Sequence, residues 1–187
     1  MSRAGFIATL RQDIGRTYAY LHGSRWHRVA ACIGSPGVHA VTVYRYGQWA
    51  QAQPALLRCV LDPIYWISSV LVRMAWGIEL PRSATIGAGL YVGHFGGITV
   101  SGQAVIGRNC NLSQGITIGS SGEAEKSGVP VIGDDVYIAP GARLFGPIRV
   151  GNNVKIGANA VVHDDIPDNA VVVLAPGFKI VSYRGNR

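Results

Sequence analysis

From residue 80 onwards the sequence repeats with a period of six residues, and this repeat limits the possible folds more than any other feature. Each hexad begins with Leu, Ile or Val, and glycine often comes next. The period is continuous once two longer breaks are allowed, at 98–99 and within 119–131. The leading residues are Leu80, Ile86, Val92, Val100, Ile106, Leu112, Ile118, Ile132, Ile138, Leu144, Val150, Ile156 and Val162.

A hexad repeat of this kind predicts a parallel β-helix. Each hexad supplies one short strand and one tight turn, three hexads close a triangular coil, and the coils stack at a spacing of about 4.8 Å. One coil cannot bury its own apolar face, so the stack is expected to fold as a unit. The leading residues should point inward, as should a second set four positions later: Ala84, Ala104, Cys110, Val136, Ala142, Val154 and Ala160.

The front of the chain lacks the repeat and shows helical spacing of apolar residues instead. We expect helical structure over 3–31 and 38–78, interrupted at 34–37 by Gly-Ser-Pro-Gly. Asp62-Pro63 is predicted to start a helix, because proline is favoured in the first helical turn. The most apolar stretch, 64–72, is too short to span a bilayer.

These patterns predict a mainly β protein, a parallel β-helix with an N-terminal α-helical region. The hand of the coil does not follow from the periodicity. The expected divisions are an N-terminal helical region (1–79), a β-helix domain (80–170) and a C-terminal tail (171–187).

Positive charge is concentrated in the helical front. Residues 1–79 hold eight arginines and three acids, a net +5, whereas 80–187 hold nine basic residues and seven acids, a net +2. Such a front could meet anionic lipid, nucleic acid or a phosphorylated substrate, or could be an ordinary solvated helix face. No basic–aromatic interleaving is present, so we expect no nucleic-acid partner.

Cysteine usage and the N-terminus favour a cytoplasmic protein. The three cysteines form no CxxC pair, which is typical of a reduced compartment, and no apolar leader segment is visible at the N-terminus. His22, His27 and His39 have no metal-ligand spacing, so no metal site is expected.

The two breaks in the repeat are the places where function is expected, because the repeats themselves are scaffold. The first break is Gly93-His94-Phe95-Gly96-Gly97-Ile98-Thr99. The second, from Gly119 to Val131, is polar and rich in glycine and serine, as a substrate lid would be.

The segments Gly77-Ile-Glu-Leu-Pro and Gly93-His94-Phe-Gly-Gly-Ile-Thr-Val resemble the serine acetyltransferase family of hexapeptide-repeat enzymes. Pro36-Gly37, Tyr44-Arg45 and Trp49 resemble the end of that family's helical region. The resemblance covers roughly 36–180 and is nearest to the polysaccharide-biosynthesis subgroup, such as the colanic acid acetyltransferases. It implies a left-handed coil, a homotrimer or dimer of trimers, and acetyl-CoA as the donor substrate.

The resemblance also implies two catalytic residues. His94 matches the histidine that deprotonates the acceptor hydroxyl, and Glu79, fifteen residues earlier, matches its acidic partner. A neutral imidazole can take a hydroxyl proton during attack on a thioester, and a carboxylate on its other nitrogen stabilises the imidazolium. The plainer interpretation is a turn histidine beside a surface glutamate.

Two departures from the family pattern bear on the acceptor. The family carries Asp before its base and Arg-His-Pro in its long loop, whereas this chain has Gly93 and Gly128-Val129-Pro130. Each lost contact to a charged serine group would cost about 1.5–3 kcal/mol. We therefore expect a hydroxyl of a saccharide or saccharide precursor as acceptor. The alternatives are a serine O-acetyltransferase and a non-catalytic β-helix scaffold subunit.

Candidate donor-binding residues are weaker signals. Small residues could let the pantetheine arm pass, and basic ones could meet the CoA phosphates, although tight turns and solvated surfaces use the same residue types. The basic helices could also bring the protein to the inner face of a membrane. The small candidates are Ala139, Gly141, Gly157 and Ala158, and the basic ones are Lys155, Arg143 and Lys179.

Overall fold

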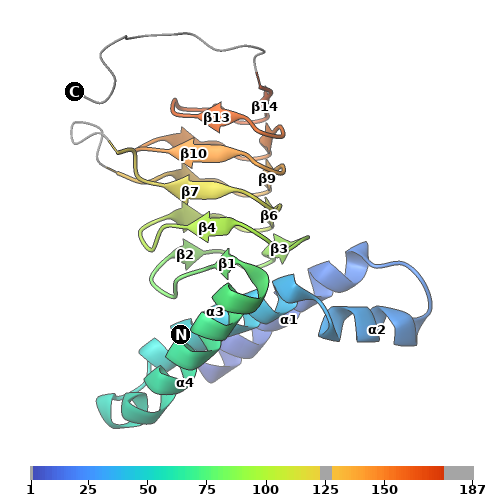
Figure 1. Ribbon diagram of the computed structural model, residues 1–187, viewed down its shortest axis with the longest axis vertical. Helices are drawn as coiled ribbons and strands as arrows, with labels where there is room; N and C mark the ends of the chain where they lie inside the picture. Colours follow the sequence, from blue (N-terminus) through green and yellow to red (C-terminus); the bar gives the residue numbers. More distant parts are fainter. Residues whose placement is uncertain (1, 123–127, 175–187) are drawn as a thin grey trace.

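The computed structural model describes residues 2–122 and 128–174, and it forms a column of short strands with four helices gathered at one end (Figure 1). The helices are α1 (Arg3–Tyr20), α2 (Arg25–Ile33), α3 (Pro36–Gln51) and α4 (Ala55–Trp76). The first strand begins two residues after α4 ends, so the helical region leads directly into the column.

The strands form three parallel sheets, which are the three sides of a prism. Their orders are β1-β4-β7-β10-β13, β11-β8-β5-β2 and β14-β12-β9-β6-β3. From β1 to β13 consecutive strands fall on different sheets, and every third strand returns to the same sheet one coil further along, whereas β14 joins β12. The parallel β-helix predicted from the hexads is therefore confirmed. The strands are β1 (Ile78–Glu79), β2 (Thr85–Ile86), β3 (Tyr91–Val92), β4 (Ile98–Val100), β5 (Val105–Ile106), β6 (Asn111–Leu112), β7 (Thr117–Gly119), β8 (Val131–Ile132), β9 (Tyr137–Ile138), β10 (Arg143–Phe145), β11 (Arg149–Val150), β12 (Lys155–Ile156), β13 (Val161–Val162) and β14 (Val171–Val172).

The prism interior contains the residues that the repeat predicts. All the leading residues are buried, and so is the whole second set. The registers explain why: Ile86 pairs with Ile106, and Ile106 with Ile132, so that like residues stack in ladders. Stacked aliphatic side chains remove apolar surface from water along the whole column, which is the main stabilising contribution.

Two predictions for the helical front have different outcomes. The interruption at 34–37 is confirmed, since α2 ends at Ile33 and α3 begins at Pro36. The predicted helix start at Asp62-Pro63 is wrong, because α4 begins at Ala55 and Pro63 lies inside it. A mid-helix proline removes one backbone hydrogen bond but does not end the helix here. Asp62 is not a cap; its carboxylate lies 2.5 Å from Nη1 of Arg82 in the first coil.

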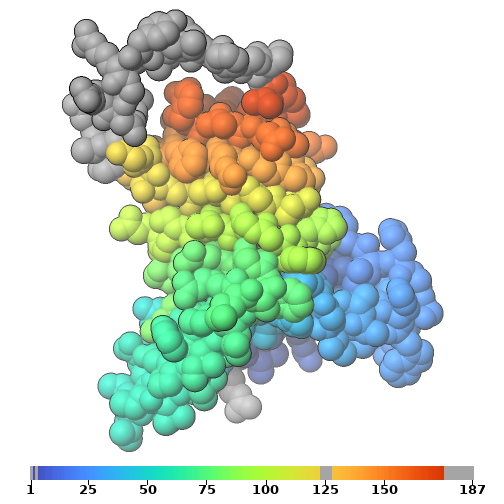
Figure 2. Space-filling model, viewed as in Figure 1, coloured from blue at the N-terminus to red at the C-terminus, as the bar shows by residue number. Residues whose placement is uncertain are grey.

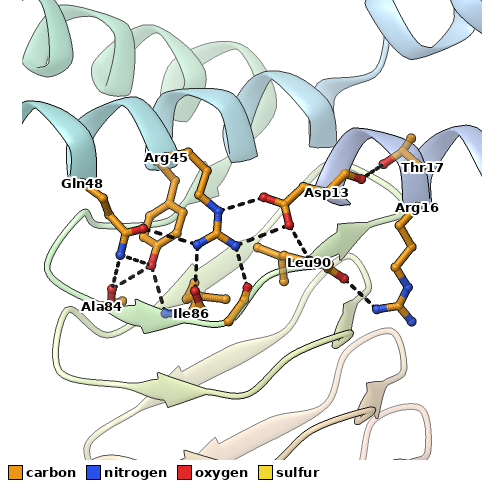
Figure 3. A network of polar contacts seen from close by, with 11 residues as sticks. Asp13, Arg16, Thr17, Arg45, Gln48, Ala84, Ile86 and Leu90 are labelled. Carbon is orange, nitrogen blue, oxygen red and sulfur yellow. Dashed lines mark hydrogen bonds and ion pairs between the residues drawn. The ribbon is translucent and has the colours of Figure 1, made fainter. Parts of the chain in front are cut away.

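The helices cover the open end of the first coil, where in the described residues β2 is an edge strand that pairs only with β5 (Figure 3). Arg45 donates to the carbonyl oxygens of Ile86 at 2.7 Å and Gly87 at 2.6 Å. Asp13 accepts from the Leu90 amide at 2.8 Å. Side chains of α1 and α3 thus supply the hydrogen bonds that a further coil would have made.

The charged part of this cap is fully buried. Arg45 Nε lies 2.8 Å from Asp13 Oδ2, and the two side chains are only 2% and 1% exposed. The Arg16 guanidinium adds a hydrogen bond of 2.6 Å to the Gly89 carbonyl. Gly37 allows α3 this close approach, because a Cβ there would overlap the Val92 carbonyl. The cap fixes the helices to the coil that carries Glu79.

The Tyr44 hydroxyl completes the cap and has a consequence for pH. It donates to the Ala84 carbonyl at 2.8 Å and accepts from the Ile86 amide at 3.0 Å. Burial raises the pKa of Tyr44 to about 12, from the usual 10.0 of a tyrosine in water. The unfolded chain therefore loses this proton at lower pH than the folded protein does.

We expect the free energy of unfolding to fall between pH 10 and about 12, with Tyr44 contributing about 1.4 kcal/mol per pH unit. Tyr44→Phe removes this contribution, so its stability should decline less steeply above pH 10 although it is lower throughout. Urea titrations of both proteins at a series of alkaline pH values measure the slopes. Equal slopes would contradict the assignment.

Candidate active site

His94 lies in the turn between β3 and β4, at the point where the end of α4 meets the first coil. The Gly96 amide donates to the Trp76 carbonyl at 2.8 Å, and the Phe95 ring packs edge-on against Trp76, with centroids 5.9 Å apart. The His94 side chain is exposed. Within the described residues it makes no hydrogen bond, so its ring is available to a substrate.

Glu79 lies on β1, which pairs with the strand that follows His94. Glu79 stands opposite Thr99 in this pairing, so Glu79 lies at the start of the first coil and the His94 turn lies at its end. Its carboxylate is 3.5 Å from Nη1 of Arg73, and the side chains of this ion pair are about half exposed. In the described part of the chain no hydrogen bond joins Glu79 to His94. The structure therefore brings the two residues to the same end of the column, with Glu79 turned towards α4.

The turn of His94 is the first of four turns stacked along one edge of the prism, which we call the His94 corner: residues 93–97, 113–115, 139–141 and 157–159. Backbone bonds join them, from the Gly115 amide to Gly96, from Gly141 to Gln114 and from Asn159 to Pro140. The fourth turn is three coil steps from His94, roughly 14 Å at the usual strand spacing.

Four of the predicted donor-binding residues lie on this same corner. Ala139 and Gly141 are in the third turn, and Gly157 and Ala158 are in the fourth. Gly141 also has a backbone reason to be glycine, because its φ is +76° and a Cβ would overlap the Asn159 side chain. The structure thus collects His94 and these small residues, 45 or more positions apart in sequence, into one line.

The basic candidates have different positions. Lys155 is exposed on the outer face of β12, without a partner in the described residues. Arg143 donates to the Gly115 carbonyl at 2.5 Å and to the Thr117 hydroxyl at 2.7 Å, so its guanidinium is occupied in holding the corner. Lys179 lies outside the described residues.

The sequence interpretation missed Gln114, which lies in the second turn of the His94 corner. Its Oε1 atom is buried and accepts no hydrogen bond from the described residues. A buried amide oxygen without a donor is costly unless water or a ligand supplies one. Gln114 follows a leading residue by two positions, and nothing in the hexad pattern distinguishes it from an ordinary turn residue.

Gly93, where the resembled enzymes carry aspartate, is bordered by an aromatic pair. A Cβ at Gly93 would lie 3.1 Å from Cε1 and 3.3 Å from the hydroxyl oxygen of Tyr91. The Tyr91 ring stacks on Tyr20 of α1, with centroids 4.3 Å apart, and Asn111 donates to the Tyr20 hydroxyl at 3.2 Å. A side chain at position 93 would therefore require Tyr91 to move slightly.

A separate hollow lies at the edge of the prism from which the 119–131 segment leaves. It is lined by Ser120, Ser121, Gly122, Phe145, Gly146, Pro147 and His163. His163 Nδ1 lies 3.0 Å from an Asp164 carboxylate oxygen, and both side chains are exposed. Residues 123–127 of this segment lie outside the described part, so its role as a lid stays a prediction.

Comparison with known proteins agrees with this architecture. Residues 130–164 match the family described as bacterial transferase hexapeptide (six repeats). A serine acetyltransferase from Bacillus pumilus is 32% identical over 94% of this chain and 78% of its own length. The chain belongs to the serine acetyltransferase family.

Two further members of the serine acetyltransferase family place limits on the comparison. The Mycobacterium tuberculosis serine acetyltransferase is 35% identical over 76% of this chain, but the chain spans only 59% of that relative. The crystal structure of the Brucella abortus serine acetyltransferase in complex with coenzyme A superposes with a TM-score of 0.77 at 26% identity, covering 93% of this chain and 67% of that one.

Proposed function

We propose that this protein is an O-acetyltransferase that uses acetyl-CoA as donor and His94 as general base. The observation that carries the proposal is the His94 corner. An exposed imidazole lies in the first of its four stacked turns, and small residues lie in the third and fourth. Family membership supports acetyl-CoA as the donor. We also propose that the coil is left-handed and that the protein is a trimer, as the family resemblance implies, so that a neighbouring subunit covers the exposed corner.

Apart from the donor and the acceptor, the reaction requires only side chains that this chain supplies. The neutral imidazole of His94 takes the proton of the acceptor hydroxyl while its oxygen attacks the thioester carbonyl. The tetrahedral intermediate then breaks its C–S bond, and the imidazolium returns the proton to the departing CoA sulfur. Small residues along the corner leave room for the extended pantetheine arm.

Glu79 is proposed as the group that stabilises the imidazolium. To do this, it must turn from Arg73 towards His94. The Arg73 pair is long and half exposed, and such surface pairs contribute about 0–1 kcal/mol. The exchange of partners is therefore inexpensive, and the positive charge that forms on His94 favours it.

L-serine is the first candidate acceptor, because the relatives are named serine acetyltransferases. The saccharide acceptor expected from the sequence finds no support in these names. It is kept as a second candidate on one observation: Tyr91, stacked on Tyr20, occupies the space beside Gly93. An aromatic pair next to the base can pack against the face of a sugar ring. It supplies no carboxylate to pair with the ammonium group of serine.

Direct product analysis separates the candidates. Purified protein is incubated with acetyl-CoA and either L-serine or a panel of hexoses and aminosugars, and the acetylated product is identified by mass spectrometry. We expect O-acetylserine at a kcat/KM of about 10⁴ M⁻¹s⁻¹ or more. Transfer to sugars alone would overturn serine and favour the second candidate. Failure to bind CoA in calorimetry would contradict the enzyme and leave the scaffold alternative.

A further inference from the structure

The outer face of α4 is apolar along its whole length, although its side chains are exposed in the described chain. Its side chains are between 48% and 81% exposed, and in Figure 2 this helix forms the outer surface of the lower end of the molecule. The residues recur at intervals of three and four: Leu57, Val60, Ile64, Ile67, Leu71 and Met74.

The inward side of α4 carries Asp62 and Tyr65, which contact the first coil, and Val72 and Trp76, which pack against the core. Asp62 pairs with Arg82 of the first coil, and the Tyr65 hydroxyl accepts from the Arg82 amide at 3.1 Å. Arg58 lies 3.4 Å from Asp62. In a surface helix of a globular protein in water, the apolar side faces the core and the polar side faces solvent. On α4 the outward side is apolar as well, where a polar side is expected.

The helix is also long and apolar enough for a lipid environment. It has 22 residues, its most apolar 18-residue window has a mean hydropathy of 1.5, and none of that window is buried. By length and composition it could cross a membrane. The apolar stretch 64–72 considered from the sequence is shorter than this window, because its limits were set at Asp62 and Arg73. The polar contacts of α4 to the first coil favour an orientation along a membrane surface, with only the outer face immersed.

A second copy of this chain is a less suitable occupant. The six residues have the spacing of a coiled-coil seam, but such seams are flanked by charged positions that pair between helices. On α4 the flanking positions are Leu56, Pro63 and Val70 on one side and Leu61, Ser68 and Ala75 on the other. The apolar surface also extends beyond a seam, to the exposed side chains of Leu56 and Trp66.

Charge favours a negatively charged surface. The helical region has a net charge of +5, against +2 for the rest of the chain. Arg58 and Arg73, near the two ends of α4, have side chains that are 41% and 47% exposed. Long arginine side chains beside an apolar face can reach lipid phosphates while the face enters the acyl region.

We propose that the outer face of α4 docks the protein onto an anionic membrane surface, with the helix lying in the plane of the interface. This would hold the enzyme at the inner face of a cytoplasmic membrane. The inference does not depend on the identity of the acceptor, and it adds a location to the acetyltransferase proposed above.

Vesicle flotation tests the docking surface. Full-length protein should float with vesicles of phosphatidylcholine and phosphatidylserine, bind pure phosphatidylcholine less, and lose binding as ionic strength rises. The triple variant Val60→Gln, Ile67→Gln, Leu71→Gln should bind anionic vesicles at least about tenfold more weakly. Trp66 supplies a second readout, since its emission should shift to shorter wavelength on binding and Trp66→Phe should lose most of that shift.

A matched control uses α2, whose Trp26 and Ile33 are more exposed than the three substituted residues of α4. The variant Trp26→Gln, Ile33→Gln should keep vesicle binding, and a loss as large as that of the α4 variant would contradict the site. Light scattering measures the oligomer mass and tests whether the face is instead an interface between copies of the chain. If wild type ignores vesicles and the α4 variant halves the oligomer mass, the face is an interface between copies and the membrane proposal fails. Acetyl transfer to a soluble acceptor should survive in the α4 variant.

Discussion

His94→Ala should lower the turnover of acetyl transfer by about 10²–10⁴-fold, the usual contribution of a general base. The substitution removes the only imidazole of the His94 corner in the described residues, while the turn backbone is held by glycines and by the bond from Gly96 to Trp76. The fold and the affinity for CoA should therefore change little. Steady-state kinetics with acetyl-CoA and calorimetry with CoA measure the two effects separately.

Two control variants sharpen this test. His163→Ala removes an exposed histidine at a different edge of the prism, and it should leave turnover unchanged. Glu79→Gln should lower kcat less than His94→Ala does, because it removes the stabilising charge and keeps the base. Wild-type turnover in His94→Ala would end the proposed mechanism, whichever acceptor is used.

Arg45→Ala or Asp13→Ala should each lower the free energy of unfolding by about 3–5 kcal/mol, because each leaves a buried charge without its partner. Arg45→Ala would also leave the Ile86 and Gly87 carbonyls without these donors. Denaturant titration followed by circular dichroism measures the loss. If either variant fails to fold, the conservative Asp13→Asn, which keeps one acceptor for the Leu90 amide, should fold with an intermediate stability.

The control for this prediction is a pair with similar chemistry at the surface. Arg108 Nη2 lies 3.0 Å from the Asp134 carboxylate on an exposed turn. Arg108→Ala should cost no more than about 1 kcal/mol. Equal losses from Arg45→Ala and Arg108→Ala would show that burial of the cap pair contributes nothing.

The sequence predicted the column well because its information is local. A leading residue such as Ile106 is inward by its place in a six-residue unit, and the same unit repeated gives its neighbours Ile86 and Ile132. The His94 turn was found for the same reason, as a break in that unit. Four small donor candidates lie on the same corner as His94, because each is in a turn that follows a strand of the same sheet, β3, β9 or β12.

The parts that were missed depend on contacts between distant segments. Pro63 resembles a helix start when only its neighbours are considered, but α4 continues through it and its Asp62 pairs with Arg82 twenty residues later. The cap joins Asp13 to Arg45, 32 positions apart, and both to the first coil. No period links such residues. The carboxylate of Glu79 likewise faces Arg73, a choice that strand order alone cannot predict.

The cap has a consequence for how the column would come apart. In a stacked repeat each unit is held mainly by its neighbours, so local opening starts where a neighbour is lost. Glu79 and His94 belong to the coil directly over the cap, whereas Gly157 and Ala158 lie three steps away. Weakening of Asp13 or Arg45 would therefore release the reacting end of the corner first and leave the far end assembled. On heating or in denaturant, activity would therefore be lost before most of the ellipticity of the β-structure, because the column opens from the end that carries His94.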